Sequence, residues 1–161
     1  MELIDTELLN VLLQSAHPAI VHFPIALLLT ATLFDVGCLV FRSLLWLDRA
    51  AVALMVLGGL ALGAAYLSGQ RAAEAAAPVT GAAQGVLADH EDLALLSLTV
   101  WSAAVVLRLF VSWLGRHDLE VQLGIFRLAA LVLAFGGVFL LVATALHGGQ
   151  LVHVYGVGVG S

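Results

Sequence analysis

Four long apolar stretches separated by polar turns run along the chain, at roughly residues 20–41, 50–67, 93–114 and 121–146. A bilayer core about 30 Å thick is crossed by about 20 apolar residues in a helix, so each stretch has the length of a membrane span. Two of the three connections are short, and one substantial loop, RAAEAAAPVTGAAQGVLADHED, joins the second stretch to the third. We therefore predict a single all-α domain, an integral membrane four-helix bundle with up-down-up-down topology.

The composition indicates a membrane protein and excludes several other classes. Of the 161 residues, 62% are hydrophobic and 11% are charged, whereas soluble domains carry about a quarter charged residues. The net charge of −5, with no lysine, lacks the basic footprint of a nucleic-acid-binding protein. Cys38 is the single cysteine, so the chain has neither an internal disulfide nor a C-x-x-C-H motif for covalent haem attachment.

The two ends of the chain differ from the spans. The opening MELIDTELLN is acidic and lacks the basic region of a cleavable signal peptide. The final LVHVYGVGVGS alternates in character, which predicts an extended C-terminal tail over residues 148–161.

The arginines predict how the bundle is oriented. Five of the six flank the first and third connections: Arg42, Arg49, Arg108, Arg116 and Arg127. Only Arg71 lies on the opposite side. The positive-inside rule places the first and third connections in the cytoplasm. Both termini and the long loop then face the periplasm, and we expect a multi-pass protein of the bacterial inner (cytoplasmic) membrane.

Five of the six histidines fall at the predicted outer face of this bundle: His17, His22, His90, His147 and His153. Ionisable groups near a membrane are costly to bury, which makes them candidates for function. Simpler explanations exist for single residues. His90 lies beside Asp89, which can cap a helix, and His17 precedes Pro18, which suits a helix start. Five histidines at one level nevertheless favour a shared site.

Imidazole nitrogens bind haem iron, zinc, copper and non-haem iron. In the predicted bundle the first and third spans lie diagonally, so His22 and His90 can approach a flat macrocycle from its two sides. We predict these two as the axial pair, with His17 and His147 as alternative ligands or as ligands of a second haem. No histidine lies in the inner half of any span, which disfavours electron transfer across the whole bilayer.

The second span carries small residues at the depth of the histidines. Ser68 and Gly69 give room for a cofactor there, although Gly59 and Gly63 form a G-x-x-x-G pattern that can mean helix packing alone. Arg71, just beyond this span, can neutralise haem propionates. Its alternative role is a weak helical pair with Glu74, three residues further on.

One acidic residue, Asp35, lies within the inner half of the first span. It can pair with Arg108 or Arg127 across the bundle, and we favour this structural role over a proton relay. Both arginines are also near enough to helix ends to extend their charged groups to the interface instead.

The stretches HPAIVHFPIAL and HGGQLVHVYGVGV resemble a bacterial family of small four-helix membrane proteins, catalogued as a domain of unknown function, whose members begin with H-P-x-x-V-H-F-P. The resemblance covers most of the chain. It implies a four-span fold and an association with respiratory or cytochrome-containing systems. Eleven positions match the family pattern: His17, Pro18, His22, Pro24, His90, His147, Gly148, Gly149, Tyr155, Gly156 and Gly158. Tyrosine is usual where this chain has His153, so the resemblance does not support His153 as a ligand.

The leading functional prediction is a membrane b-type cytochrome, or a cytochrome-like subunit, that holds one or two non-covalent haem b groups near the periplasmic face. Bis-His ligation leaves no open iron position and favours electron transfer over catalysis. Expected partners are membrane lipid, a periplasmic cytochrome c or a quinol-linked respiratory complex, and a second copy of the chain. The alternatives are a non-haem copper, zinc or iron site, and a structural subunit of a respiratory complex.

Overall fold

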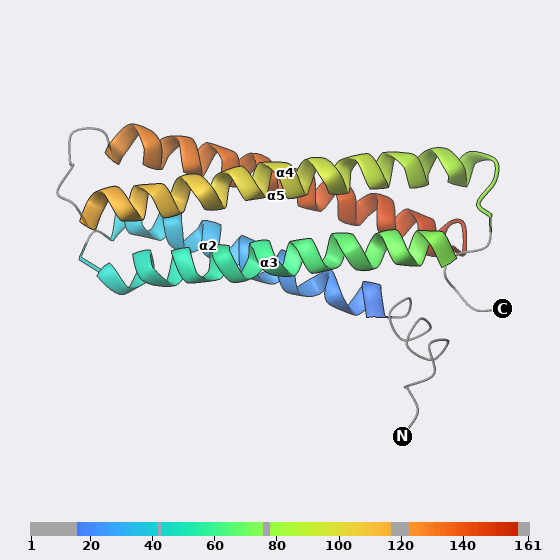
Figure 1. Ribbon diagram of the computed structural model, residues 1–161, viewed down its shortest axis with the longest axis horizontal. Helices are drawn as coiled ribbons and strands as arrows, with labels where there is room; N and C mark the ends of the chain where they lie inside the picture. The colour runs from blue at the N-terminus through green and yellow to red at the C-terminus, as the bar shows by residue number, and fades with distance from the viewer. Residues whose placement is uncertain (1–15, 42, 76–77, 117–122, 158–161) are drawn as a thin grey trace, which may run out of the picture.

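The computed structural model describes residues 16–41, 43–75, 78–116 and 123–157. Within them the chain forms a bundle of four long helices: α2 (His22–Val40), α3 (Leu45–Ala75), α4 (Ala82–Arg116) and α5 (Leu123–His153). Consecutive helices run in opposite directions and lie side by side, and α5 also packs on α2, so α2 and α4 are diagonal (Figure 1). Each helix is long and apolar enough to cross a membrane, which confirms the predicted fold class.

Three of the helices extend beyond the predicted spans. The long loop is mostly helical, because its alanine-rich arms continue α3 to Ala75 and start α4 at Ala82. Alanine has the highest helix propensity of all residues, and the arms therefore stay helical where their apolar character falls. Between them lies Pro78, and Gly81, immediately before α4, has a φ of +67°. The left-handed backbone at that position suits glycine.

The predicted extended tail over 148–161 is wrong in its first part, because α5 continues to His153. Leu151 is buried and fastens this last turn to the bundle. The helix then ends in an αL motif at Gly156, whose φ is +67°. The amide of Gly156 donates to the carbonyl of Val152 at 3.1 Å, and that of Val157 donates to Leu151 at 2.9 Å. Residues 158–161 lie outside the described part of the chain.

The start of the first span departs slightly from a regular helix. Residues 16–20 are helical, Val21 keeps helical dihedrals and donates its N–H to the carbonyl of His17 at 3.1 Å, and α2 begins at His22. Pro24 has no N–H to donate to the carbonyl of Ile20, so the helical ladder is broken at this point. The missing donor costs little in the first turn of α2, where amides have no helical partner in any case.

The core lies halfway along the bundle, where Leu28, Met55 and Trp101 are almost fully buried. Two glycines let these side chains come close: a Cβ on Gly58 would lie 2.6 Å from Leu28, and one on Gly137 would lie 2.6 Å from Trp101. Large apolar side chains are also exposed on all four helices, as expected for a surface that faces lipid.

Polar groups gather at the two ends of this bundle. The histidine end comprises His17, His90 and His147 with Ser68 and Thr144. The arginine end comprises Asp35, Asp48, Arg108, Ser112 and Arg127. Along the helices, 18 residues separate His17 from Asp35 and also His90 from Arg108, which corresponds to about 27 Å.

Candidate functional site

Three histidines converge at the histidine end from three different helical segments. His17 lies in the helical turn before α2, His90 in α4 and His147 near the end of α5. His90 is close enough to interact electrostatically with the rings of both His17 and His147. All three side chains are partly buried. The fold therefore gathers residues that are 73 and 57 positions apart along the chain.

His17 is held by Ser68 of α3, with Nδ1 2.9 Å from the serine Oγ. The serine hydroxyl already donates its single hydrogen to the carbonyl of Ala65 at 2.9 Å. The hydroxyl can therefore only accept from the ring, so His17 carries its proton on Nδ1. The ring also hydrogen-bonds to the backbone of Ala65. With the proton on Nδ1, the lone pair of the neutral ring lies on Nε2.

His90 and His147 are held in the same way, but by main-chain carbonyls. The Nδ1 of His90 donates to the carbonyl of Thr144 at 2.9 Å, and that of His147 donates to Ala143 at 2.9 Å. A carbonyl only accepts, so the proton again lies on Nδ1 and Nε2 keeps its lone pair. Histidines that bind metals typically donate the second ring N–H to a carbonyl or another oxygen, which fixes the ring.

Two glycines provide the space in which two of these rings lie. A Cβ on Gly69 would lie 2.9 Å from Cε1 of His17, and one on Gly148 would lie 3.1 Å from Cε1 of His90. At Ser68 and Gly69, where the sequence predicted room for a cofactor, the structure places the ring of His17. The adjacent Gly149 has open space around it.

Helix α5 also supports His90 through a series of hydrogen bonds that begins at Thr144. Thr144 donates its hydroxyl to the carbonyl of Leu140 at 2.8 Å, and its Oγ1 lies 3.2 Å from the Oγ of Ser97. Since the threonine hydrogen is committed, Ser97 donates to Thr144. Ser97 is almost fully buried, so this hydrogen bond links α4 to α5 inside the bundle.

His22, one of the two predicted axial ligands, lies apart from these three. Its side chain is exposed, and its Nδ1 donates to the carbonyl of Pro18 at 2.7 Å within its own segment. Five helical residues turn about 500°, so His17 and His22 lie about 140° apart around the axis. When His17 faces the bundle, His22 therefore faces away from it. The structure pairs His90 with His17 and His147 rather than with His22.

The remaining predicted residues lie outside the cluster. Arg71 is exposed on α3, and His153 is exposed at the end of α5. Glu91, next to His90, is exposed and interacts with its ring electrostatically. His117 lies outside the described residues.

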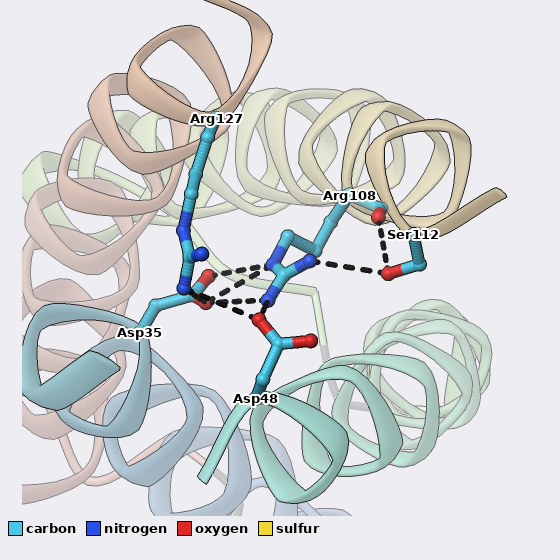
Figure 2. A network of polar contacts seen from close by, with 5 residues as sticks. All are labelled: Asp35, Asp48, Arg108, Ser112 and Arg127. Carbon is cyan, nitrogen blue, oxygen red and sulfur yellow. Dashed lines mark hydrogen bonds and ion pairs between the residues drawn. The ribbon is translucent and has the colours of Figure 1, made fainter. Parts of the chain in front are cut away.

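At the arginine end, Arg108 of α4 binds carboxylates of two other helices, α2 and α3, and a serine of its own helix (Figure 2). Its Nε donates to both carboxylate oxygens of Asp35 at 3.0 and 3.1 Å, its Nη2 to Asp48 at 2.6 Å, and its Nη1 to Ser112 at 3.1 Å. Arg108 is 1% exposed and Asp35 3%. The predicted pairing of Asp35 with Arg108 is confirmed, and the prediction missed Asp48.

Arg127 of α5 reaches the same carboxylates from the other side (Figure 2). Its Nη2 lies 3.2 Å from Asp48 and 4.0 Å from Asp35. In the described part of the chain, Asp35, Cys38 and Asp48 form the single set of three metal-ligand residues whose ligand atoms all lie within 4.8 Å of one another. Two arginines already neutralise both carboxylates there, which disfavours a cation. The three histidine rings are more widely spaced and would have to turn towards one another to share an ion.

The family described as "Predicted membrane protein (DUF2231)" matches residues 14–161. The match covers nearly the whole chain, and the protein belongs to this family of predicted membrane proteins. Among curated proteins and solved structures, none matches the chain.

Proposed function

We propose that this member of the family is a membrane metal-binding protein whose site is the histidine end of the bundle. His17, His90 and His147 would bind a transition-metal ion through Nε2. One observation carries the proposal: all three rings hold their proton on Nδ1 through a hydrogen bond to oxygen, with Nε2 left as the ligand atom. Neutral imidazole suits copper, zinc and iron.

Haem b is the second candidate, with His17 taking the place predicted for His22. The observation that favours it is the diagonal position of the first span and α4, which sets His17 and His90 on opposite sides of the bundle axis. Iron ligated by both rings would have no open position, and the chain would then carry electrons rather than catalyse a reaction.

The arginine distribution supports an orientation with the histidine end outside the cytoplasm. In the bacterial inner membrane this end would face the periplasm, where a cytochrome c or a quinol-linked respiratory complex is the matching electron partner. Association of several copies would be compatible with the large exposed apolar surface of the helices.

Elemental analysis and absorption spectra of the protein, purified in mild detergent from cells supplied with metals and haem, test the proposal. We expect about one metal ion per chain, or a Soret band in the haem case. His90→Ala should remove most of the bound metal, and His22→Ala, the matched control on the exposed side, should leave it unchanged. Equal metal content in the wild type, His90→Ala and a His17→Ala/His147→Ala double variant would show that these rings bind nothing.

A further inference from the structure

A cavity of about 850 Å³ lies at the arginine end, between all four helices. Its polar wall contains both aspartates of the charged network, and three arginines: Arg49, Arg108 and Arg127. Its apolar wall contains Leu39, Leu44 and Leu128, which are also exposed on the outside of the bundle. The cavity therefore joins a charged interior to the surface that faces lipid.

The hydrogen bonds of the two inner arginines differ. Every nitrogen of the Arg108 guanidinium donates to an oxygen of Asp35, Asp48 or Ser112. In Arg127, by contrast, the buried Nε has no oxygen partner among the described residues, and Nη2 makes an ion pair with Asp48 at 3.2 Å but no hydrogen bond of good geometry. Arg127 lies beside the thiol of Cys38, a weak acceptor at most. A buried guanidinium nitrogen without an oxygen partner is uncommon, so Arg127 retains capacity to donate to a further acceptor in the cavity.

The charges of the cavity wall indicate the net charge of a ligand that would fit there. Among the described residues of the wall, three arginines face two aspartates, which leaves one positive charge in excess when all five are ionised. A cation is disfavoured, and a singly charged oxyanion would balance the wall. Arginine suits phosphate oxygens in particular, because its planar fork donates two parallel hydrogen bonds.

We propose that this cavity binds the phosphodiester headgroup of an anionic phospholipid. The headgroup accepts hydrogen bonds from Arg127, and the acyl chains leave past Leu39, Leu44 and Leu128 into the bilayer. Positive-inside orientation places the arginine end at the cytoplasmic leaflet, where anionic lipids bind basic pockets between membrane helices. The site lies about 27 Å from the histidine end, and it does not depend on the metal proposal.

Thermal unfolding of the full-length, delipidated protein in detergent tests the proposal. Phosphatidylglycerol should raise Tm in a saturable way and more than phosphatidylcholine does at the same concentration. Arg127→Gln should weaken the apparent affinity for phosphatidylglycerol about tenfold, the loss of one charge-assisted hydrogen bond. Arg71→Gln removes the same charge from an exposed site at the opposite end and should keep the wild-type preference.

Each variant is compared with itself in the two lipids, so a lower starting Tm does not affect the result. Arg127→Lys, which keeps the charge and loses the fork, should retain part of the preference and provides a reading if Arg127→Gln fails to fold. Equal shifts with the two lipids, or full preference in Arg127→Gln, would overturn the proposal. The same shift from inorganic phosphate alone, or a larger one from a neutral quinone, would assign the cavity to a different ligand and overturn it too.

Discussion

The histidine end and the arginine end of the bundle satisfy their polar groups in opposite ways. Arg108 has an oxygen partner at every nitrogen, and its carboxylate partner Asp35 is buried between two cations. Each of the three histidines is bonded at one ring nitrogen and leaves the other with its lone pair. The arginine end is thus a cross-link between helices, whereas at the histidine end each ring is oriented by a hydrogen bond at Nδ1.

The largest effect should come from breaking the cross-link. Arg108→Met leaves Asp35 buried with only Arg127 at 4.0 Å, and removing one partner of a buried ion pair costs about 3–5 kcal/mol. Unfolding in detergent, followed by circular dichroism, measures the loss. Arg71→Met at the exposed surface should change stability by less than about 0.5 kcal/mol. Equal stability of the two variants would show that the buried network does not hold the helices together.

The charged network was partly predictable, and the reason lies in its residue types. A carboxylate inside an apolar span needs a cation, and only a few arginines lie at its depth, so Asp35 with Arg108 or Arg127 follows from the sequence. Asp48 gives a weaker signal, because an acid near the start of a span is expected at the interface. Its approach to Arg108 depends on how α3 is rotated about its axis, which no local pattern fixes.

The sequence predicts at which end of the bundle the histidines gather, but only partly which of them lie together. Counting residues along the spans places the histidines at one end. The choice of His22 over His17 required knowing which side of the first helix faces the bundle. In the structure that rotation packs His17 on Gly69 and leaves His22 exposed. Both His17 and His22 follow apolar or small neighbours, so the sequence pattern did not separate them.

A second prediction tests whether glycines at the histidine end make room for ligands. In Gly69→Ala the new Cβ would lie 2.9 Å from the His17 ring, which must move. We expect metal affinity to fall about 10- to 100-fold, the range seen when the orientation of a metal ligand is disturbed. Stability should change little, because the ring is the flexible partner. Competition with a chromogenic chelator measures the affinity.

Gly63→Ala is the matched control on the same helix, because nothing lies within 4 Å of a Cβ at that position. It should leave metal affinity unchanged. A loss of affinity in Gly63→Ala as large as that in Gly69→Ala would point to a change in α3 as a whole rather than to the His17 ring.

A third, smaller effect should follow from removing the hydrogen bond that orients the His17 ring without changing the space around the ring. Ser68→Ala removes the oxygen that accepts from Nδ1 of His17, so the ring can adopt either tautomer and turn. Metal affinity should fall about tenfold, with a stability loss of about 1 kcal/mol for the hydrogen bond. Ser68→Thr keeps the acceptor and should retain most of the affinity. Isothermal titration with the metal alone compares the two, and equal affinities would remove Ser68 from the site.

The smallest effect should come from the exposed half of the arginine end. The Asp48 side chain is 40% exposed against 4% for Asp35, so water can replace part of what it gives to Arg108 and Arg127. Asp48→Asn keeps an oxygen for Nη2 of Arg108 and should cost about 0.5–1 kcal/mol, the range of partly exposed ion pairs. The same substitution at Asp35 should cost several times more, because no water reaches that carboxylate. Urea or detergent unfolding of the two variants side by side measures the ratio. Equal losses of stability in the two variants would contradict this prediction. The two carboxylates would then contribute equally to the network, whatever their exposure.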